Sequence, residues 1–525
     1  MEQVKRHVPL HEDNEVCRYL LNGITHNGIC IQESQTPGAG SGLFTTRGFA
    51  EGECIFRTRP LTSFIQSGLS SVCDLCFSNK ASKIDPSGRF RTSKTPPQNT
   101  VPSCSGCKVT RYCSEACCHE SALCHRYECE IFSKCTNLGI KEGLLYRIIV
   151  QREHGLISDQ QWRALWKLMS HHTDHLQGPD FESITQIAKE AKTLTGSSLE
   201  LLDIQKLHCL LRTNCISIRQ PGQNVVLGTT LDVVASLMNH SCNPNVVLFF
   251  EGNELRVQSL RPLQANEELT QCYTDVQCDV LLRQKLLEEN YFFTCCCARC
   301  REELDYHQKR ELGNNSHIEV VRQTQQQLLN LVNNTVAKAS TNIESVNVDE
   351  VATTAETLAD ETAVDGNWPD DLEPLPSLWK TLGRISQAQG NALTGLEYSL
   401  EGCASTKRRI GPRWMDDLFE LIQVFTHVLV LPEDDSVFQD ESFPRKSELS
   451  ILFYGYLEEL FRLGRNIYGL DTCYVQAIKN WLKELRGSSE QPWNGRLASN
   501  ERFSESHGKL LEWIGVDRGK WIVGC

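Results

Sequence analysis

The chain has 525 residues, of which 40% are hydrophobic and 23% are charged, and its formal net charge is -13 at pH 7. At roughly 100–200 residues per domain, this length predicts about three or four domains with ample core, and the apolar content excludes a wholly disordered chain. No stretch approaches the ~18 uncharged apolar residues of a membrane-spanning helix, so we expect no membrane partner. The acidic balance argues against a general nucleic-acid coat and favours basic partners.

Short apolar pieces punctuated by glycine, from Gly38 to Phe56, predict strands joined by turns. From about residue 130 to 212 the leucines and isoleucines recur at helical spacing, which predicts helices. From Val225 onward short β-prone runs return. Two of them, Val246–Phe250 and Leu255–Leu260, are separated by Glu251-Gly-Asn, which predicts a hairpin.

The amino-acid composition changes again beyond Arg301. Between Lys338 and Lys380 there are ten acidic residues and no basic one, which predicts a solvated linker or long loop at about 339–379. The remaining residues, to the end of the chain, are helical in pattern, as in the apolar face that runs from Leu449 to Phe461.

Most of the 25 cysteines are clustered in two regions of the sequence. Ten lie between Cys73 and Cys135, and a second group lies between Cys242 and Cys300. The first 16 residues lead into no apolar core of a secretory signal, so we expect a reducing compartment. There, thiols at short spacings are more typical of metal ligands than of disulfides. The pattern therefore predicts two separate metal regions.

The first region contains two Cys-x2-Cys pairs, a spacing that places both thiolates on one ion across a tight turn. Four further ligands follow at spacings that suit helical turns. Together they make eight ligands, enough for two zinc ions: Cys73, Cys76, Cys104, Cys107, Cys113, Cys117, His125 and Cys129.

This set, including the Tyr112-Cys113 pair, resembles a MYND zinc finger. The resemblance implies an interleaved arrangement, in which Cys73, Cys76, Cys113 and Cys117 hold one ion and Cys104, Cys107, His125 and Cys129 hold the other. It also implies proline-containing partner peptides.

The loop inside the finger region carries an excess of basic residues, which suits nucleic-acid phosphates. The alternative is that the loop is merely a solvated surface. The basic residues are Lys80, Lys83, Arg89, Arg91, Lys94, Lys108 and Arg111, against the single acid Asp85.

The segment Asn239-His-Ser-Cys-Asn-Pro-Asn245 is rich in turn-forming polar residues and predicts a loop that places side chains at a site. With Gly40-Ser41-Gly42 upstream, Glu267–Asp275 downstream and Cys295-x-Cys297-x2-Cys300, it resembles a SET domain. A MYND finger inserted within a SET domain resembles the SMYD family, over residues 28–301, with the arthropod-type members as the expected nearest relatives.

The resemblance implies an α+β fold: a SET β-fold interrupted by a zinc-binding MYND finger and a helical insertion, then a zinc-bound post-SET segment and an α-helical C-terminal domain. The implied parts are 28–70 and 206–275 for the SET domain, 71–130 for the finger, 131–205 for the helical insertion, 276–301 for the post-SET segment and 302–525 for the helical C-terminal region.

The family's residue roles transfer position by position. S-adenosylmethionine is the implied cofactor, bound by Gly40, Ser41, Gly42, Asn239, His240, Tyr273 and Phe293. We expect Gly40 and Gly42 to let the backbone approach the cofactor, because a Cβ would obstruct it. Tyr273 and Tyr291 are the implied catalytic pair, at the methyl-transfer pore and the lysine channel. Cys242, Cys295, Cys297 and Cys300 would hold a third, structural zinc.

The function implied is protein-lysine N-methylation, with a lysine-bearing protein such as a histone as substrate, a link to transcription, a monomeric chain and a location in nucleus and cytoplasm. A rival hypothesis is a catalytically weak or inactive SET scaffold that recruits partners through the finger for transcriptional repression. Ala39, Ser41 and Ile216, which depart from the family's usual residues, keep that rival open.

Overall fold

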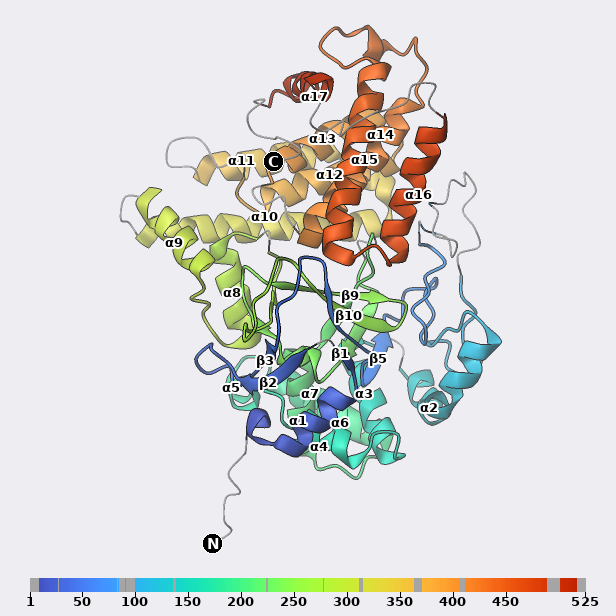
Figure 1. Cartoon of the computed structure of the whole chain (residues 1–525), viewed down its shortest axis with the longest axis vertical. Coiled ribbons are helices and arrows are strands. Elements are labelled where there is room, and N and C mark those ends of the chain that lie inside the picture. The colour runs from blue at the N-terminus through green and yellow to red at the C-terminus, as the bar shows by residue number, and fades with distance from the viewer. Residues whose placement is uncertain are drawn as a thin grey trace. The chain divides into compact units, whose positions relative to one another are not determined.

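The computed structural model describes residues 9–26, 28–82, 84, 90, 100–135, 138–222, 225–276, 278–310, 315–362, 371–406, 411–488 and 501–516. Contacts divide the chain into two compact units (Figure 1). The first comprises Met1–Tyr273, Leu287–Thr294 and Ile467–Cys473, and the second comprises the remaining residues. Within the described ranges, no helix has both the length and the apolar character needed to cross a membrane.

The first unit is built on small sheets that join residues from both sides of the cysteine-rich finger. Strand β4 (Cys54–Thr58) pairs with β10 (Glu254–Ser259), and β5 (Thr62–Ile65) pairs with β7 (Gly228–Leu231), all antiparallel. The predicted hairpin is confirmed, because β9 (Val246–Glu251) pairs with β10 across Gly252, whose φ is +61°. The predicted α+β class, with a β-fold interrupted by an insertion, is therefore confirmed.

The remaining strands of this unit complete a four-stranded, a three-stranded and two two-stranded sheets in the described residues. They are β1 (Thr25–His26), β2 (Ile29–Glu33), β3 (Ser41–Thr45), β6 (Ile216–Ile218), β8 (Asn239–His240) and β11 (Thr270–Gln271). The strand orders are β1-β4-β10-β9, β5-β7-β6, β2-β3 and β11-β8, the last being parallel.

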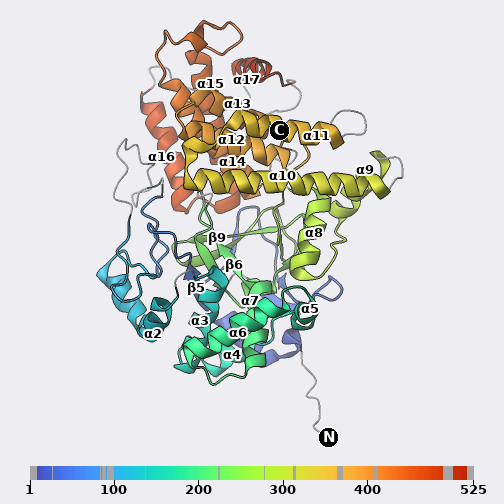
Figure 2. The same ribbon diagram turned by 180° about the vertical axis from the view of Figure 1, so that it is seen from behind.

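The predicted helical insertion is also present. Helix α3 (Ile140–Glu153) packs against β5 and β7, and the view from behind shows it beside β5 (Figure 2). Its Gly143 allows this close approach, since a Cβ there would lie 2.4 Å from the Phe64 ring. The other helices of the unit are η1 (Leu10–Glu12), α1 (Asn14–Asn22), α2 (Glu115–Ser133), α4 (Asp159–Leu165), α5 (His172–Gln177), α6 (Phe181–Thr195), α7 (Leu201–Asn214) and η2 (Ala235–Leu237).

A distant segment of the chain, Ile467–Cys473, completes the first unit. The Asp471 carboxylate accepts hydrogen bonds from Arg57 and Arg256, each over 3.0 Å. The Tyr468 ring lies edge-on to Phe249, with 5.0 Å between the ring centroids. These contacts cover β4, β10 and β9 with residues that follow them by more than 200 positions.

The second unit is helical in the residues described. Its helices are α8 (Val280–Tyr291), whose last turn belongs to the first unit, α9 (Ala298–Arg310), α10 (Asn315–Thr341), η3 (Ile343–Ser345), α11 (Val348–Thr362), α12 (Leu375–Ala388), α13 (Ala392–Ala404), α14 (Gly411–Leu429), η4 (Ser436–Gln439), α15 (Lys446–Tyr468), α16 (Cys473–Ser488) and α17 (Glu501–Trp513). Helices α12 and α13 pack closely, and Lys380 of α12 forms a buried 2.8 Å ion pair with Asp417 of α14.

The acidic segment predicted as a linker at about 339–379 differs from that expectation. It contains all of α11 and the first turns of α12, while residues 363–370 lie outside the described part. Ala352, Ala355 and Ala359 are buried on one face of α11, and the acidic side chains are exposed on the other. The interpretation as a loop was wrong there because the small apolar face of the helix is hidden among acidic residues.

Acidification is expected to destabilise the first unit through His208, a buried residue of α7. Burial, with the nearby positive charge of Arg212, lowers the pKa of His208 to about 4. In the unfolded chain its pKa is about 6.5, so the unfolded state binds the extra proton between these values. The stabilisation that the neutral His208 provides is complete above about pH 6.5 and is lost as the pH falls towards 4. The free energy of unfolding then decreases by about 3 kcal/mol.

Urea unfolding of His208→Gln and wild type at pH 7.5 and pH 5 measures this contribution. The variant should lose less stability on acidification than wild type does. The exposed His119, replaced by glutamine, is the matched control and should retain the wild-type pH dependence. Equal acid sensitivity in the His208 variant and wild type would contradict the prediction.

Candidate functional site

The first two predicted metal sites are assembled in the first unit with the predicted interleaved pairing. The ligand atoms of Cys73, Cys76, Cys113 and Cys117 lie within 4.8 Å of one another, as do those of Cys104, Cys107, His125 and Cys129. Such groups of thiols with one imidazole suit tetrahedral zinc, and the closed sets of four leave no open position for substrate. Both sites therefore fit structural zinc.

Helix α2 carries three of these ligands, the first of them in its first turn. Its N-cap Ser114 accepts a hydrogen bond from the Cys117 backbone N–H, which starts the helix directly after Cys113. His125 and Cys129 follow on the same helix. The predicted helical presentation is thus confirmed for these three ligands, whereas Cys113 precedes the helix.

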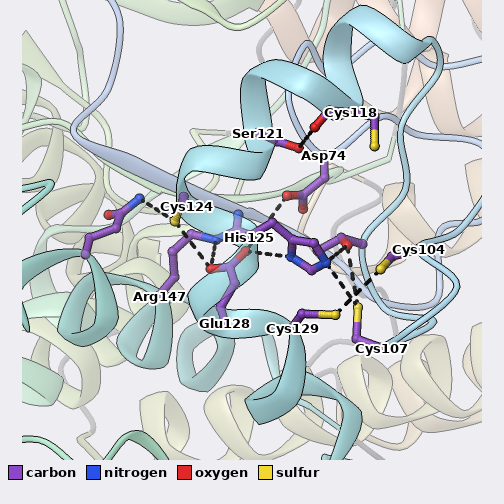
Figure 3. A network of polar contacts seen from close by, with 12 residues as sticks. Asp74, Cys104, Cys107, Cys118, Ser121, Cys124, His125, Glu128, Cys129 and Arg147 are labelled. Carbon is purple, nitrogen blue, oxygen red and sulfur yellow. Dashed lines mark hydrogen bonds and ion pairs between the residues drawn. The ribbon is translucent and has the colours of Figure 1, made fainter. Parts of the chain in front are cut away.

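A buried arginine connects the surroundings of both finger sites (Figure 3). Arg147 of α3 donates to both carboxylate oxygens of Glu128, over 2.9 and 2.8 Å, and to Asp74 over 2.9 Å. Glu128 also contacts Nδ1 of the ligand His125 over 3.3 Å, and Asp74 lies between the ligands Cys73 and Cys76. Arg147 donates further to the Ser63 carbonyl of β5. One guanidinium therefore links both metal sites to the sheet.

The third predicted ligand set is also brought together. The thiols of Cys242, Cys295, Cys297 and Cys300 lie within 4.8 Å of one another, which again fits zinc. Two residues of α8 support this set. Gln284 forms a pair of hydrogen bonds with the Cys295 backbone, over 2.6 and 2.8 Å, and the buried Arg283 contacts Cys300 Sγ over 3.7 Å.

Elemental analysis of the folded chain is expected to find three zinc ions. Because the thiolates are assembled only in the fold, metal binding and folding are coupled. Cys297→Ser should lose one ion and keep the two finger ions. The exposed Cys296, replaced by serine, is the matched control and should keep all three. Two ions in the folded wild-type chain would contradict one of the assignments.

The polar segment that begins at Asn239 is held against β11 and β3. Its first two residues form β8, paired in parallel with β11, rather than the loop predicted for all of 239–245, because ladder bonds to Thr270 and Gln271 extend them. Asn239 Nδ2 donates to the Ser41 carbonyl over 3.1 Å and to Glu268 Oε1 over 2.9 Å. Asn239 is thereby fixed beside Gly40–Gly42, where β3 begins.

Gly40, just before β3, and Gly42, within it, are required for different reasons. Gly40 has a φ of +74°, which glycine adopts without strain, and a Cβ there would meet nothing within 4 Å. At Gly42 a Cβ would lie 2.6 Å from Glu268 Oε1 and 3.2 Å from Asn239 Nδ2. The obstruction at Gly42 thus comes from the chain's own side chains. Ser41 Oγ lies 3.0 Å from His11 Nδ1.

His240 connects the tyrosine segment to the third metal set. The Tyr273 backbone N–H donates to His240 Nδ1 over 3.0 Å. Because that nitrogen accepts, the proton of the neutral imidazole belongs on Nε2, which lies 3.1 Å from Cys242 Sγ. A hydrogen bond from an imidazole to a ligand thiolate orients that ligand.

Three aromatic residues gather beside His240. The Tyr273 and Tyr291 ring centroids are 4.7 Å apart, and the Phe293 centroid is 5.7 Å from that of His240. The Tyr273 hydroxyl donates to the Met238 carbonyl over 3.1 Å. Burial raises the pKa of Tyr273 well above its usual value and that of Tyr291 to about 12. Both phenols therefore stay protonated at neutral pH.

The structure thus assembles the predicted site residues of the first unit into one neighbourhood. These glycines, the Asn239 amide, the His240 imidazole and the aromatic rings suit a cofactor that carries an amino acid and an adenine ring. The described residues leave the space beside Gly40 open, and they make no hydrogen bond to Asn239 Oδ1, so both are available to such a cofactor. Sequence reasoning missed Glu128, Arg147, Glu268 and Arg283. Glu268 lies in a quoted motif, but no spacing signal marks the others.

Comparison with known proteins agrees with this arrangement. The SET-domain family model matches residues 40–274. The chain is 28% identical over 287 residues to the Arabidopsis thaliana protein "Histone-lysine N-methyltransferase ASHR1", over 52% of this chain and 55% of the relative.

Two further relatives match a similar share of the chain. One is the Schizosaccharomyces pombe "SET domain and MYND-type zinc finger protein 6", 25% identical over 51% of each chain. The other is the Mus musculus "Histone-lysine N-methyltransferase SMYD3", 27% identical over 52% of this chain and 62% of the relative. The match thus spans between about half and two thirds of each relative's length.

Proposed function

We propose that the chain is a member of the SET and MYND domain family, SMYD, and that it is a protein-lysine N-methyltransferase that uses S-adenosylmethionine. The observation that best supports this function is that Asn239, the Gly40–Gly42 segment and the tyrosine pair lie in one neighbourhood. The names of the relatives from Arabidopsis thaliana and Mus musculus support the same reaction class.

We assign the roles of the site residues on this basis. Asn239 and His240 bind the amino-acid and adenine parts of the cofactor, Phe293 stacks on the adenine, and Gly40, Ser41 and Gly42 form the adjoining backbone wall. The cofactor, when bound, supplies an activated methyl group. The chain's own contribution is mainly geometric, because displacement at a methyl carbon requires an aligned, neutral amine.

Tyr273 orients and stabilises rather than acting as a base. Burial raises the pKa of its phenol well above the usual value, so a proton on its oxygen is retained at neutral pH. Its O–H is committed to the Met238 carbonyl, which directs the oxygen lone pairs elsewhere in the site. Tyr291, whose hydroxyl lies 3.5 Å from the Tyr273 carbonyl, lines the lysine channel beside it.

The substrate is a protein that presents a lysine, and a basic histone tail suits the net charge of -13. We propose action in nucleus and cytoplasm, a monomeric chain and proline-containing partners at the finger. We also propose the domain boundaries that the resemblance implies, with helix α11 inside the segment 339–379. The basic finger loop, proposed as a weaker nucleic-acid contact, lies largely outside the described residues.

Calorimetry of the purified chain with S-adenosylmethionine tests the proposal, followed by transfer of labelled methyl groups to proteins of a lysate. We expect saturable one-site binding and label on lysine. Asn239→Ala should weaken binding about tenfold, the scale of one hydrogen bond to a charged group. Asn243→Ala, four positions along the same segment, is the matched control. Binding without any transfer would favour the scaffold that recruits partners through the finger, and absence of binding would overturn the enzyme.

A further inference from the structure

Glu268 lies where three separate parts of the first unit converge. It comes two residues before Thr270, the β11 partner of Asn239, and it forms a β-bridge with Phe44 of β3. The residue is only 7% exposed. A carboxylate removed from water in this way is costly unless donors surround it.

The donors come from the loop between β2 and β3 and from β8. Glu268 Oε1 accepts from Ser34 Oγ over 2.7 Å and from Asn239 Nδ2 over 2.9 Å. Glu268 Oε2 accepts from the Gln35 backbone N–H over 2.9 Å. These donors are all neutral, and within the described ranges no basic side chain lies at ion-pair distance. The carboxylate is therefore devoted to holding neutral groups in place.

The same contacts fix the orientation of the Asn239 amide. Its NH₂ group donates to both Glu268 Oε1 and the Ser41 carbonyl. An amide flip would place Oδ1 against these two acceptors and lose both hydrogen bonds. Asn239 consequently presents Oδ1, an acceptor, on its other side. Gly42 is part of this arrangement, because a Cβ there would displace the carboxylate that lies 2.6 Å away.

We propose that Glu268 is a positioning residue that makes the site selective for the amino group of its cofactor. This inference rests on the proposed function and adds a residue to it. Glu268 orients the Asn239 amide so that Oδ1 is available to accept a hydrogen bond from an ammonium group. It also holds the Ser34–Gln35 loop beside Asn239 through hydrogen bonds. Binding of the adenosine part does not depend on Glu268.

Two ligands separate these parts of the site: S-adenosylhomocysteine, which carries the amino acid, and 5′-methylthioadenosine, which lacks it. Glu268→Gln keeps the size of the side chain but puts an NH₂ group against donors. We expect its affinity for S-adenosylhomocysteine to fall about tenfold or more, the scale of one or two lost charge-assisted hydrogen bonds. Its affinity for 5′-methylthioadenosine should stay within about twofold of wild type.

Glu267→Gln is the matched control. Its carboxylate bonds to the Gln264 backbone and to Asn245, away from Asn239, so neither ligand should lose affinity selectively. Gly42→Ala is a second test, because its Cβ pushes the carboxylate aside, and it should show the same selective loss. Equal loss of both ligands, or no loss, in Glu268→Gln would overturn the inference. A wild-type chain that binds neither ligand would instead overturn the proposed function and this inference with it.

Discussion

Replacing Tyr273 by phenylalanine is expected to slow methyl transfer about 10²-fold or more, the scale of losing one positioned polar group at a reacting centre. The substitution removes the oxygen and leaves the Met238 carbonyl without this donor. The ring remains beside that of Tyr291, so the shape of the site is retained. Cofactor affinity should change little, and the effect should therefore appear in kcat rather than in cofactor Kd.

Single-turnover transfer of labelled methyl groups, with cofactor affinity measured separately, tests this expectation. Tyr19→Phe, which removes the same atom from α1, is the matched control and should transfer at the wild-type rate. Because the phenol stays protonated, the wild-type rate should show no step from Tyr273 ionisation between pH 7 and 9. Wild-type rates in Tyr273→Phe would remove this tyrosine from the chemistry.

Replacing Arg147 by methionine is expected to give the largest loss of stability among the variants considered. The Glu128 and Asp74 carboxylates would stay buried without their shared cation, a situation that costs about 3–5 kcal/mol. Because Glu128 contacts His125 and Asp74 lies between Cys73 and Cys76, both finger ions should leave faster to a chelator. The ion of the third ligand set should be released at the wild-type rate.

Arg152 lies on the same helix and provides the matched control. It pairs with Asp159, a carboxylate that is 92% exposed, and such surface pairs contribute about 0–1 kcal/mol. Arg152→Gln should therefore unfold and release zinc much as wild type does. Arg147→Lys keeps the charge without the bidentate geometry and should lie between the two. If Arg147→Met kept its finger zinc as firmly as Arg152→Gln, the buried network would have no role in holding the metal.

The metal ligands could be predicted because their signal is local: two thiols on one ion require a short, recognisable spacing. The supporting residues could not. Arg147 follows Asp74 by 73 positions, and nothing in the sequence around either residue marks the pair. Helix α11 was missed for another reason, since three buried alanines are too small an apolar face to stand out among exposed acids.

The sequence predicted which residues belong to the cofactor neighbourhood but not the hydrogen bonds between them. Resemblance assigned Asn239, His240 and Tyr273, whereas their mutual hydrogen bonds depend on register. Parallel pairing of β8 with β11 places Asn239 opposite Thr270 and His240 opposite Gln271. Only that register brings the Tyr273 N–H to His240 and the Glu268 carboxylate to Asn239.

The turn that contains Asp471 bears on how the chain folds as it is synthesised. Arg57 leaves the ribosome 414 residues before its partner Asp471, and Arg256 leaves it 215 residues before. Contacts so far apart in sequence form slowly, and domains made early usually fold before later ones emerge. Here Phe249, on the sheet of β4, β10 and β9, lacks its contact with Tyr468 until that residue has been synthesised. The nascent first unit is therefore expected to need protection from aggregation until Ile467–Cys473 has been made.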